Sequence, residues 1–316
     1  MHVAPMSEDD LQDVIRGWNA ALPHDQLTEQ EFRRIILQDP NQEPQGLLLA
    51  KADDGSPLGL TVCVVRRTVE GRDGGGREDE YRRGFLKGFF VAEAREAEAA
   101  ASQLLAAAET YCGEAGKEEL RVTEYTGPYV WPGIDLRYER LRGILAQHGY
   151  RDIWTIEDVG VDLRDSRLQA RLDRARAGLG PGHTLLTWQP ESMPAMRRFA
   201  AEGNQPQWFP VGWESGLSQP RENVLILKKR REILGWAQYS PGRPRAGFGP
   251  ILVLERARGR GYGSLLLLEC MIRAREQGAE YMEAGWANTG FYTANGWDIV
   301  RRYAVLTKAL GGGERP

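Results

Sequence analysis

The most constraining feature of this 316-residue chain is an internal repeat, in which two segments present the same order of expected strands and helices. Apolar strands at 47–51 and 58–64 predict a β-hairpin in the first segment. Strands at 224–228 and 233–237 predict the same hairpin in the second, and both return strands open with Leu-Gly. Because similarity at this scale indicates duplicated units, we expect two domains of one fold rather than one large domain.

The two segments continue in the same order after the hairpins. Each has a strand, a helix, a further strand, a second helix, a Gly-aromatic pair and a final strand. The matched pieces are 88–91 and 249–254, 96–113 and 261–278, 119–123 and 281–286, Gly149-Tyr150 and Gly296-Trp297, and 153–161 and 299–306. Alternating strands and helices are typical of an α/β or α+β fold, which is the class we expect for both halves.

The stretch between the two segments predicts the domain boundary. Residues 166–177 form an expected Arg-rich, exposed helix with Ser166 as its N-cap, and the run Gly-Leu-Gly-Pro-Gly at 178–182 then breaks regular structure. We therefore expect domains at 1–165 and 183–316, joined by a linker at 166–182.

Composition excludes several classes of protein. The content of 41% hydrophobic and 27% charged residues is that of a globular chain, and the net charge of −3 argues against a general nucleic-acid binder. Cys63, Cys112 and Cys270 form no C-x-x-C pair and the four histidines lack ligand spacing, so no disulfide framework or metal site is predicted. For His183 a structural role is favoured over a catalytic one. With no apolar run of membrane length and no signal pattern at the start, we expect a cytoplasmic protein without a membrane partner.

The segment 253–266 is the one that indicates chemistry. An apolar strand ends, glycines follow at Gly259, Gly261 and Gly263, and an apolar helix begins. Glycine permits positive φ and close approach, and the free N–H groups of a helix start bind anions such as a pyrophosphate. A P-loop is excluded because its Lys is absent, and the glycine spacing is wrong for a dinucleotide fold.

This segment resembles the acetyl-CoA-binding motif of the GNAT superfamily of N-acetyltransferases, Arg/Gln-x-x-Gly-x-Gly/Ala, which here reads Arg258-x-x-Gly261-x-Gly263. The second motif of that family is matched by Phe291-Tyr292 followed by Gly296-Trp297. The resemblance is strong over 220–308 and weak over 1–165. Two copies in one chain resemble the tandem architecture of mycothiol synthase, which implies two GNAT-type domains, each with a mixed central sheet flanked by helices.

The resemblance implies a role for each matched residue. Tyr292 would be the general acid that protonates the leaving CoA thiolate. The backbone N–H near Val253 would stabilise the oxyanion. The residues implied for the cofactor are Ile251, Leu252 and Val253 for the pantetheine, Arg258, Gly259, Arg260, Gly261, Tyr262, Gly263 and Ser264 for the pyrophosphate, and Asn288 near the cofactor.

Two departures from the family pattern concern Asn288 and the general base. Asn288 stands four residues before Tyr292 rather than about seven, so this helix is expected to be one turn shorter. The strand 248–254 carries no carboxylate where many members have a Glu. The general base therefore stays open between a water chain and four side chains, which are Glu214, Glu232, Glu283 and Tyr239. Among these we take Glu214 as the candidate, because it lies in an aromatic segment that is expected to face the acceptor.

The first half lacks the phosphate-binding glycines. With Leu104-Leu105 aligned on Leu265-Leu266, the motif positions are taken by Ala97, Glu98, Ala100 and Ser102. Acidic side chains repel a pyrophosphate. We expect a degenerate copy that is structural or forms a wall of the acceptor pocket.

The resemblance implies transfer of an acetyl group from acetyl-CoA to a primary amine by direct attack, in the second domain. Two alternatives stay open: a non-catalytic protein that binds or senses acyl-CoA, and an acyltransferase for a thiol-precursor amine, as in mycothiol synthase. The expected acceptor is a small-molecule or peptide amine. The chain is expected to be a monomeric pseudo-dimer or a homodimer.

Overall fold

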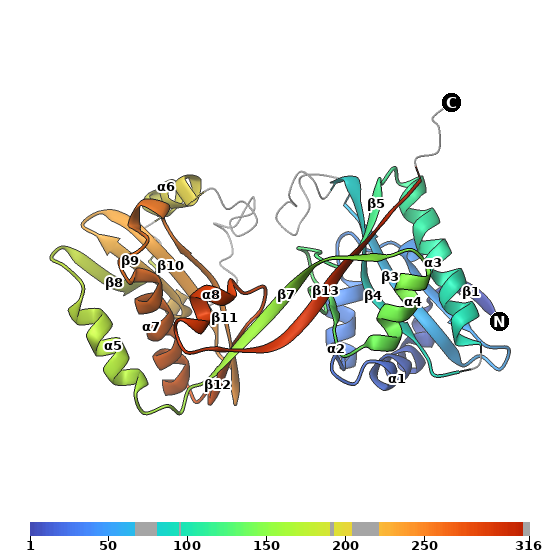
Figure 1. Ribbon diagram of the computed structural model, residues 1–316, viewed down its shortest axis with the longest axis horizontal. Coiled ribbons are helices and arrows are strands. Elements are labelled where there is room, and N and C mark those ends of the chain that lie inside the picture. The colour runs from blue at the N-terminus through green and yellow to red at the C-terminus, as the bar shows by residue number, and fades with distance from the viewer. Residues whose placement is uncertain (67–80, 95, 190–192, 204–220, 312–316) are drawn as a thin grey trace. The chain divides into compact units, whose positions relative to one another are not determined.

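The computed structural model describes residues 1–66, 81–94, 96–189, 193–203 and 221–311 of the chain. These residues form two compact units (Figure 1). The first unit comprises Met1–Ile156 and Arg302–Pro316, and the second comprises Glu157–Arg301. Both are mixed α/β structures, which confirms the predicted fold class.

The first unit is a sheet in the order β1-β2-β3-β4-β5-β13, with helices packed on it (Figure 1). All neighbours are antiparallel except β4 and β5, which are parallel. Its elements are β1 (His2–Pro5), α1 (Leu11–Ala21), α2 (Glu29–Phe32), a π-helical turn (Arg33–Leu37), β2 (Leu47–Lys51), β3 (Pro57–Val65), β4 (Arg83–Val91), α3 (Ala97–Glu114), β5 (Glu119–Val122), β6 (Ile134–Asp135), α4 (Glu139–Gln147) and the start of β7 (Arg151–Asp162).

The second unit repeats this arrangement with the order β7-β12-β11-β10-β9-β8. Here too one pair is parallel, β11 with β12, and the others are antiparallel. Its elements are α5 (Leu168–Ala177), β8 (His183–Thr187), α6 (Met193–Gly203), β9 (Val224–Lys229), β10 (Glu232–Ser240), β11 (Arg245–Val253), α7 (Tyr262–Glu276), β12 (Tyr281–Ala284), α8 (Thr289–Thr293) and the start of β13 (Asp298–Ala309).

The two halves of the chain exchange their last strands. The end of β7, which closes the first half of the sequence, pairs with β12 through Val159–Asp162. The end of β13, which closes the second half, pairs with β5 through Leu306–Ala309. Each unit is therefore completed by a strand from the other half, and the compact units are not the contiguous segments 1–165 and 183–316 that the sequence suggests.

The segment expected as a linker, 166–182, contributes to a core. Its helix α5 lies against α7 (Figure 1), and Leu168 and Leu172 are fully buried in the second unit. The expected helix is present and most of its residues are exposed, but these two leucines at i and i+4 make one apolar stripe among the arginines and bury one face of it.

Both predicted hairpins are confirmed as β2–β3 and β9–β10, and the two long helices begin within about one residue of their expected starts. The strand expected at 281–286 ends at Ala284. The reason is backbone conformation, since Trp286 has φ 52°, which a β-strand does not allow.

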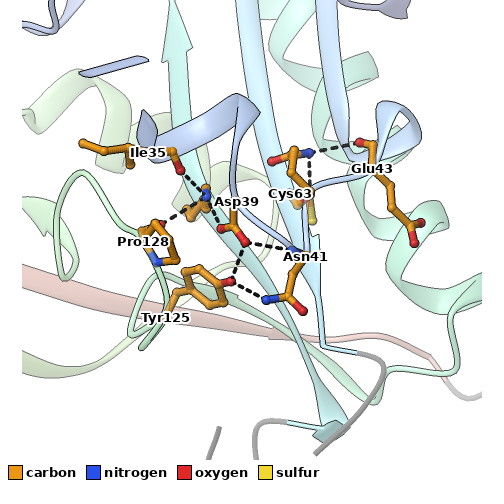
Figure 2. A network of polar contacts seen from close by, with 9 residues as sticks. Ile35, Asp39, Asn41, Glu43, Cys63, Tyr125 and Pro128 are labelled. Atoms are coloured by element: carbon orange, nitrogen blue, oxygen red, sulfur yellow. Dashed lines mark hydrogen bonds and ion pairs between the residues drawn. The ribbon is translucent and has the colours of Figure 1, made fainter. Parts of the chain in front are cut away.

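A buried ion pair between Lys87 and Asp39 joins β4 of the first unit to the chain after the π-helical turn, and both side chains are fully buried. The Lys87 ammonium also donates to the carbonyls of Ile35 (2.8 Å) and Pro128 (3.1 Å). Figure 2 shows Asp39 accepting in turn from the Tyr125 hydroxyl (3.0 Å). Burial lowers the pKa of Lys87, while Asp39 opposes that shift.

We expect Lys87→Met to destabilise the protein by about 3–5 kcal/mol, because it leaves the Asp39 carboxylate buried without its countercharge. Denaturant unfolding measures this change. The matched control is Arg164→Met, which removes an exposed partner of Asp162 and should cost less than about 1 kcal/mol. Equal stability of the two variants would contradict the structural role given to Lys87.

Candidate active site

The site begins where β11 and β12 part. The parallel ladder between them covers three pairs only, Arg245–Tyr281, Ala246–Met282 and Gly247–Glu283. On its other edge β11 stays paired with β10 as far as Val253. The later part of β11, with Ile251, Leu252 and Val253, thus lies beyond the ladder with β12 and has a backbone edge turned to that side.

A bulge in β11 accompanies this divergence. The register with β10 shifts between Ala237, opposite Ile251, and Tyr239, opposite Phe248, so β11 carries one extra residue there. Gly249 and Pro250 lie in the bulge, and Pro250 has no N–H to donate to a ladder. The bulge interrupts the alternation of faces along β11 between Phe248 and Ile251.

The predicted glycine turn follows β11. Gly259 and Gly261 have φ of 73° and 77°, and a Cβ at either position would meet no atom within 4 Å. Side chains are excluded there by backbone conformation rather than by crowding, and the space beside the backbone is open. An anion can therefore approach the backbone of this turn.

Helix α7 starts directly after the turn. Its N-cap is Gly261, which supplies no side-chain cap, so the N–H groups of Tyr262, Gly263 and Ser264 are those that a helix leaves without an internal partner. Their positive end suits a phosphate. The exposed Arg258 donates to the carbonyl of Val253 (3.2 Å), which keeps its guanidinium beside the turn.

The Tyr262 side chain is structural. Its hydroxyl lies 2.8 Å from Nε2 of His183 in β8, and Nδ1 of His183 lies 2.8 Å from the Gly180 carbonyl. Because a carbonyl only accepts, Nδ1 carries the proton and Nε2 accepts from the tyrosine. His183 therefore anchors β8 to α7.

The second motif places Tyr292 in an aromatic cluster. On α8 its ring packs edge-on against Phe248 (6.1 Å between centroids), Phe291 (5.1 Å) and Trp297 (5.2 Å). Gly296, at φ 82°, ends the helix and lets the Trp297 N–H donate to the Tyr292 carbonyl (3.1 Å). Phe248 belongs to this cluster and carried no motif in the sequence.

The Tyr292 side chain is mostly buried and keeps a protonated hydroxyl. The side chain is 6% exposed, and within the described chain no group is hydrogen-bonded to its hydroxyl. Because this oxygen is not a buried polar atom left without a partner, it reaches solvent. Burial raises the pKa of Tyr292 above its ordinary value, and the Cys270 thiol adds to the rise. The phenol stays protonated at neutral pH.

Gly263 brings the two motifs together. A Cβ on Gly263 would lie 3.0 Å from Cε2 of Phe291, closer than side chains normally pack. The start of α7 and helix α8 are therefore in direct contact, and the third glycine of the motif serves packing rather than backbone freedom.

The remaining predicted residues divide as follows. Asn288 is the exposed N-cap of α8. The base candidates Glu232, Glu283 and Tyr239 are bonded to Arg256, Arg245 and Gln277 respectively, and Glu214 lies outside the described residues. Arg260 is exposed beside the turn.

The first unit lacks this arrangement at both motifs. Helix α3 already begins at Ala97, with Glu96 as its N-cap and Glu98 in its first turn, so helix occupies the positions of the glycine turn. Leu145, fully buried, stands four residues before Gly149, where the second unit has Tyr292. In the part of the chain that the structure describes, no group of three His, Cys, Asp or Glu side chains is placed for a metal, and no helix is long and apolar enough to span a membrane.

Residues 183–297 match the family model described as the acetyltransferase (GNAT) family. A comparison with curated proteins found no match. The matched segment includes the glycine turn, α7, α8 and the Gly-aromatic pair.

Solved structures of low identity share the fold. The chain aligns with a GCN5-related N-acetyltransferase from Sphaerobacter thermophilus at TM-score 0.71 and 16% identity, over 100% of this chain and 96% of that one. A tandem GNAT protein from the clavulanic acid biosynthesis pathway aligns at TM-score 0.66 and 15% identity, over 99% of each chain. A GCN5-related glucosamine N-acetyltransferase region of a fungal multi-domain GH3 β-N-acetylglucosaminidase aligns at 0.76 and 16%, over 97% of this chain, which spans 38% of that protein. The predicted tandem GNAT-type fold is confirmed.

We expect Gly263→Ala to destabilise the protein by about 1–3 kcal/mol, because its methyl group must displace the Phe291 ring. Thermal unfolding measures the loss. Gly143→Ala in α4 is the control, since its Cβ meets no atom within 4 Å and alanine favours a helix interior. A Gly263→Ala protein as stable as the control would contradict the contact between the motifs.

Proposed function

We propose that the second unit transfers an acetyl group from acetyl-CoA to a primary amine, because residues 183–297 match the acetyltransferase (GNAT) family model and the chain shares the fold of tandem GNAT proteins. Acyl transfer is the class of reaction that the family match supports. The acetyl group, the amine acceptor and the restriction to the second unit are the finer parts of the proposal.

One observation carries the proposal: the open glycine turn at Gly259 and Gly261 leads into the uncapped start of α7, beside the part of β11 that β12 does not pair. A pyrophosphate fits the first feature, since it needs N–H donors and space without side chains. A chain of amide groups such as pantetheine fits the second, because it can bond to a free strand edge.

The residues of the chain then have separate tasks. The backbone of Ile251–Val253 binds and orients the pantetheine, and the N–H groups from Gly259 to Ser264 hold the pyrophosphate, with Arg258 and Arg260 adding positive charge. Acetyl-CoA supplies the acyl group as an activated thioester. Tyr292 donates its phenolic proton to the departing sulfur. The first unit, without glycines or tyrosine at these positions, has a supporting role.

The competing proposal of a non-catalytic acyl-CoA sensor differs in one measurable way. It predicts binding of acetyl-CoA with no release of free CoA on any amine. The transfer proposal predicts release with at least one member of a panel of primary amines, thiol-precursor amines included.

We expect Gly261→Glu to abolish stabilisation by acetyl-CoA, because it places a carboxylate and a strained backbone in the pyrophosphate site. In the wild type, ligand at about 100 times its Kd should stabilise by about 2.7 kcal/mol, measured as a rise in Tm. Gly55→Glu is the control, since Gly55 has φ 88° and open surroundings but lies in the β2–β3 turn. If Gly261→Glu kept the full Tm rise, the proposed site would be refuted.

We expect Tyr292→Phe to lower kcat by about 100-fold with unchanged acetyl-CoA affinity, since only the proton donor is lost. Because the pKa of Tyr292 is raised, its proton should be lost only above the ordinary phenol value of about 10, so the wild-type kcat should show no alkaline decline from this group below that pH. Tyr150→Phe in the first unit serves as the control. An unchanged kcat in Tyr292→Phe would remove this residue from its role.

A further inference from the structure

The sheet of the second unit has two faces at the point where β11 and β12 part. Phe248 contacts Tyr292 and lies on the same face of β11 as Ala246, two residues before it. Ala246 is paired with Met282 of β12, and Met282 with Val161 of β7, so these residues share that face. Neighbouring residues in each strand point the opposite way. Glu283 therefore lies on the face opposite Tyr292, at the last pair of the β11–β12 ladder.

Glu283 has a glycine on each side of it, Gly247 on β11 and Gly160 on β7. A Cβ on Gly247 would meet only Ser240, at an ordinary 3.6 Å, so the space beside Glu283 is open there. On the other side, Gly160 leaves room for the Tyr281 hydroxyl, which would lie 2.3 Å from a Cβ. Glu283 itself is paired with Arg245.

Asp158 lies on the same face, two residues before Gly160 in β7. Its Oδ1 accepts from the N–H of Trp286 (3.3 Å), the residue whose left-handed backbone follows the end of β12. This bond holds the carboxylate beside the point where the two strands part. Asp158 is half-buried.

The electrostatic surroundings favour a cation. Burial raises the pKa of the Tyr281 phenol, and the carboxylates of Glu283, Asp298 and Asp162 raise it further, against the opposing effect of Arg245. Three carboxylates surround this phenol against the one guanidinium of Arg245, and such an excess of negative charge attracts an ammonium ion.

The first unit offers an internal comparison. Its matching ladders place Arg121 opposite Phe85 on one side and opposite Thr307 on the other, so Arg121 stands at the position of Glu283. The same register puts the fully buried Val305 at the position of Asp158. Both carboxylates and both glycines are thus present only in the unit that has the glycine turn and Tyr292.

We propose that Asp158 is the base of the transfer reaction and that Glu283 positions the acceptor, which arrives as a primary ammonium ion on the face of the sheet opposite Tyr292. This inference rests on the proposed function and adds to it the base and the charge of the acceptor. The base is contributed by the strand that the first half of the chain lends to the second unit.

The transfer moves protons as well as the acetyl group. Asp158 takes one proton from the ammonium group, and the neutral nitrogen attacks the thioester carbon. A C–N bond forms and the C–S bond breaks. The sulfur leaves with the electron pair and receives a proton from Tyr292, while the second proton of the attacking nitrogen and the proton on Asp158 pass to solvent, from which Tyr292 is reprotonated.

The test compares Asp158→Asn, Glu283→Gln and the control Asp152→Asn in the full chain, by release of free CoA from acetyl-CoA. Asp152 is an exposed carboxylate of β7 in the first unit and is paired with Arg142. Asparagine keeps an oxygen for the Trp286 N–H, so the fold is retained. The probes are butylamine, putrescine and lysine amide, which are ammonium ions at neutral pH, and p-anisidine, which is neutral there. Acetyl-CoA affinity, read from the Tm rise, should match the wild type in all three variants.

With the best alkylamine we expect Asp158→Asn to lose at least about 100-fold in kcat and Glu283→Gln to raise KM about tenfold, while Asp152→Asn keeps the wild-type rate. The loss with p-anisidine should be much smaller, because that amine needs no proton removed before attack. An equal loss with both kinds of amine would mean a merely structural role and overturn the inference.

Failure of this inference is distinguishable from failure of the proposed function. Turnover by the wild type with undiminished rates in Asp158→Asn overturns the assignment of the base and leaves acetyl transfer standing. Acetyl-CoA binding without CoA release on any amine overturns both, and favours the sensor. Should Asp158→Asn fail to fold, Glu283→Gln is measured with the same two kinds of amine. A rise in KM for the alkylamines alone supports the inference, and an equal change in KM for the alkylamines and p-anisidine overturns it.

Discussion

The early end of one short parallel ladder determines the arrangement of the candidate site. β11 and β12 are joined by three residue pairs, after which β11 continues with β10 alone. The residues beyond the last pair have a strand edge available for a ligand's amides. The aromatic cluster around Tyr292 lies on one face of this point and the carboxylates of Asp158 and Glu283 lie on the other. A longer ladder with β12 would close this edge of β11 to a ligand.

The same ladder exists in the first unit, with different side chains around it. β4 and β5 are also joined by three pairs, and Glu124 has the left-handed φ that Trp286 has after β12. The backbone geometry was therefore kept in both copies. What differs is the filling: Phe85 packs on Tyr125 (5.3 Å between centroids), and Arg121 is bonded to Glu119 and Glu124. Large buried side chains replace the open, acidic face, and a helix replaces the glycine turn.

Local features of the sequence were sufficient to predict part of the fold and part of the candidate site. Alternating apolar residues gave the hairpins, and the glycine spacing led to the turn whose positive φ values at Gly259 and Gly261 are found in the structure. The role of Gly263 was not predictable, since its reason is contact with Phe291 on another helix. Asp158 carried no signal at all, because it is far in sequence from the motifs and reaches them only through strand pairing. Burial of one face of α5 was missed because its two leucines stand among arginines.

The exchanged strands also impose an order on the synthesis of the protein. Glu119 in β5 is bonded to Thr307 at a sequence separation of 188 residues, and Glu109 to Lys308 at 199. A ribosome delivers the first half of the chain long before these partners exist, so the N-terminal sheet has an open edge at β5 until the last strand emerges. Non-local pairing of this kind slows folding and exposes strand edges during translation. The N-terminal unit, although made first, is the last to be completed.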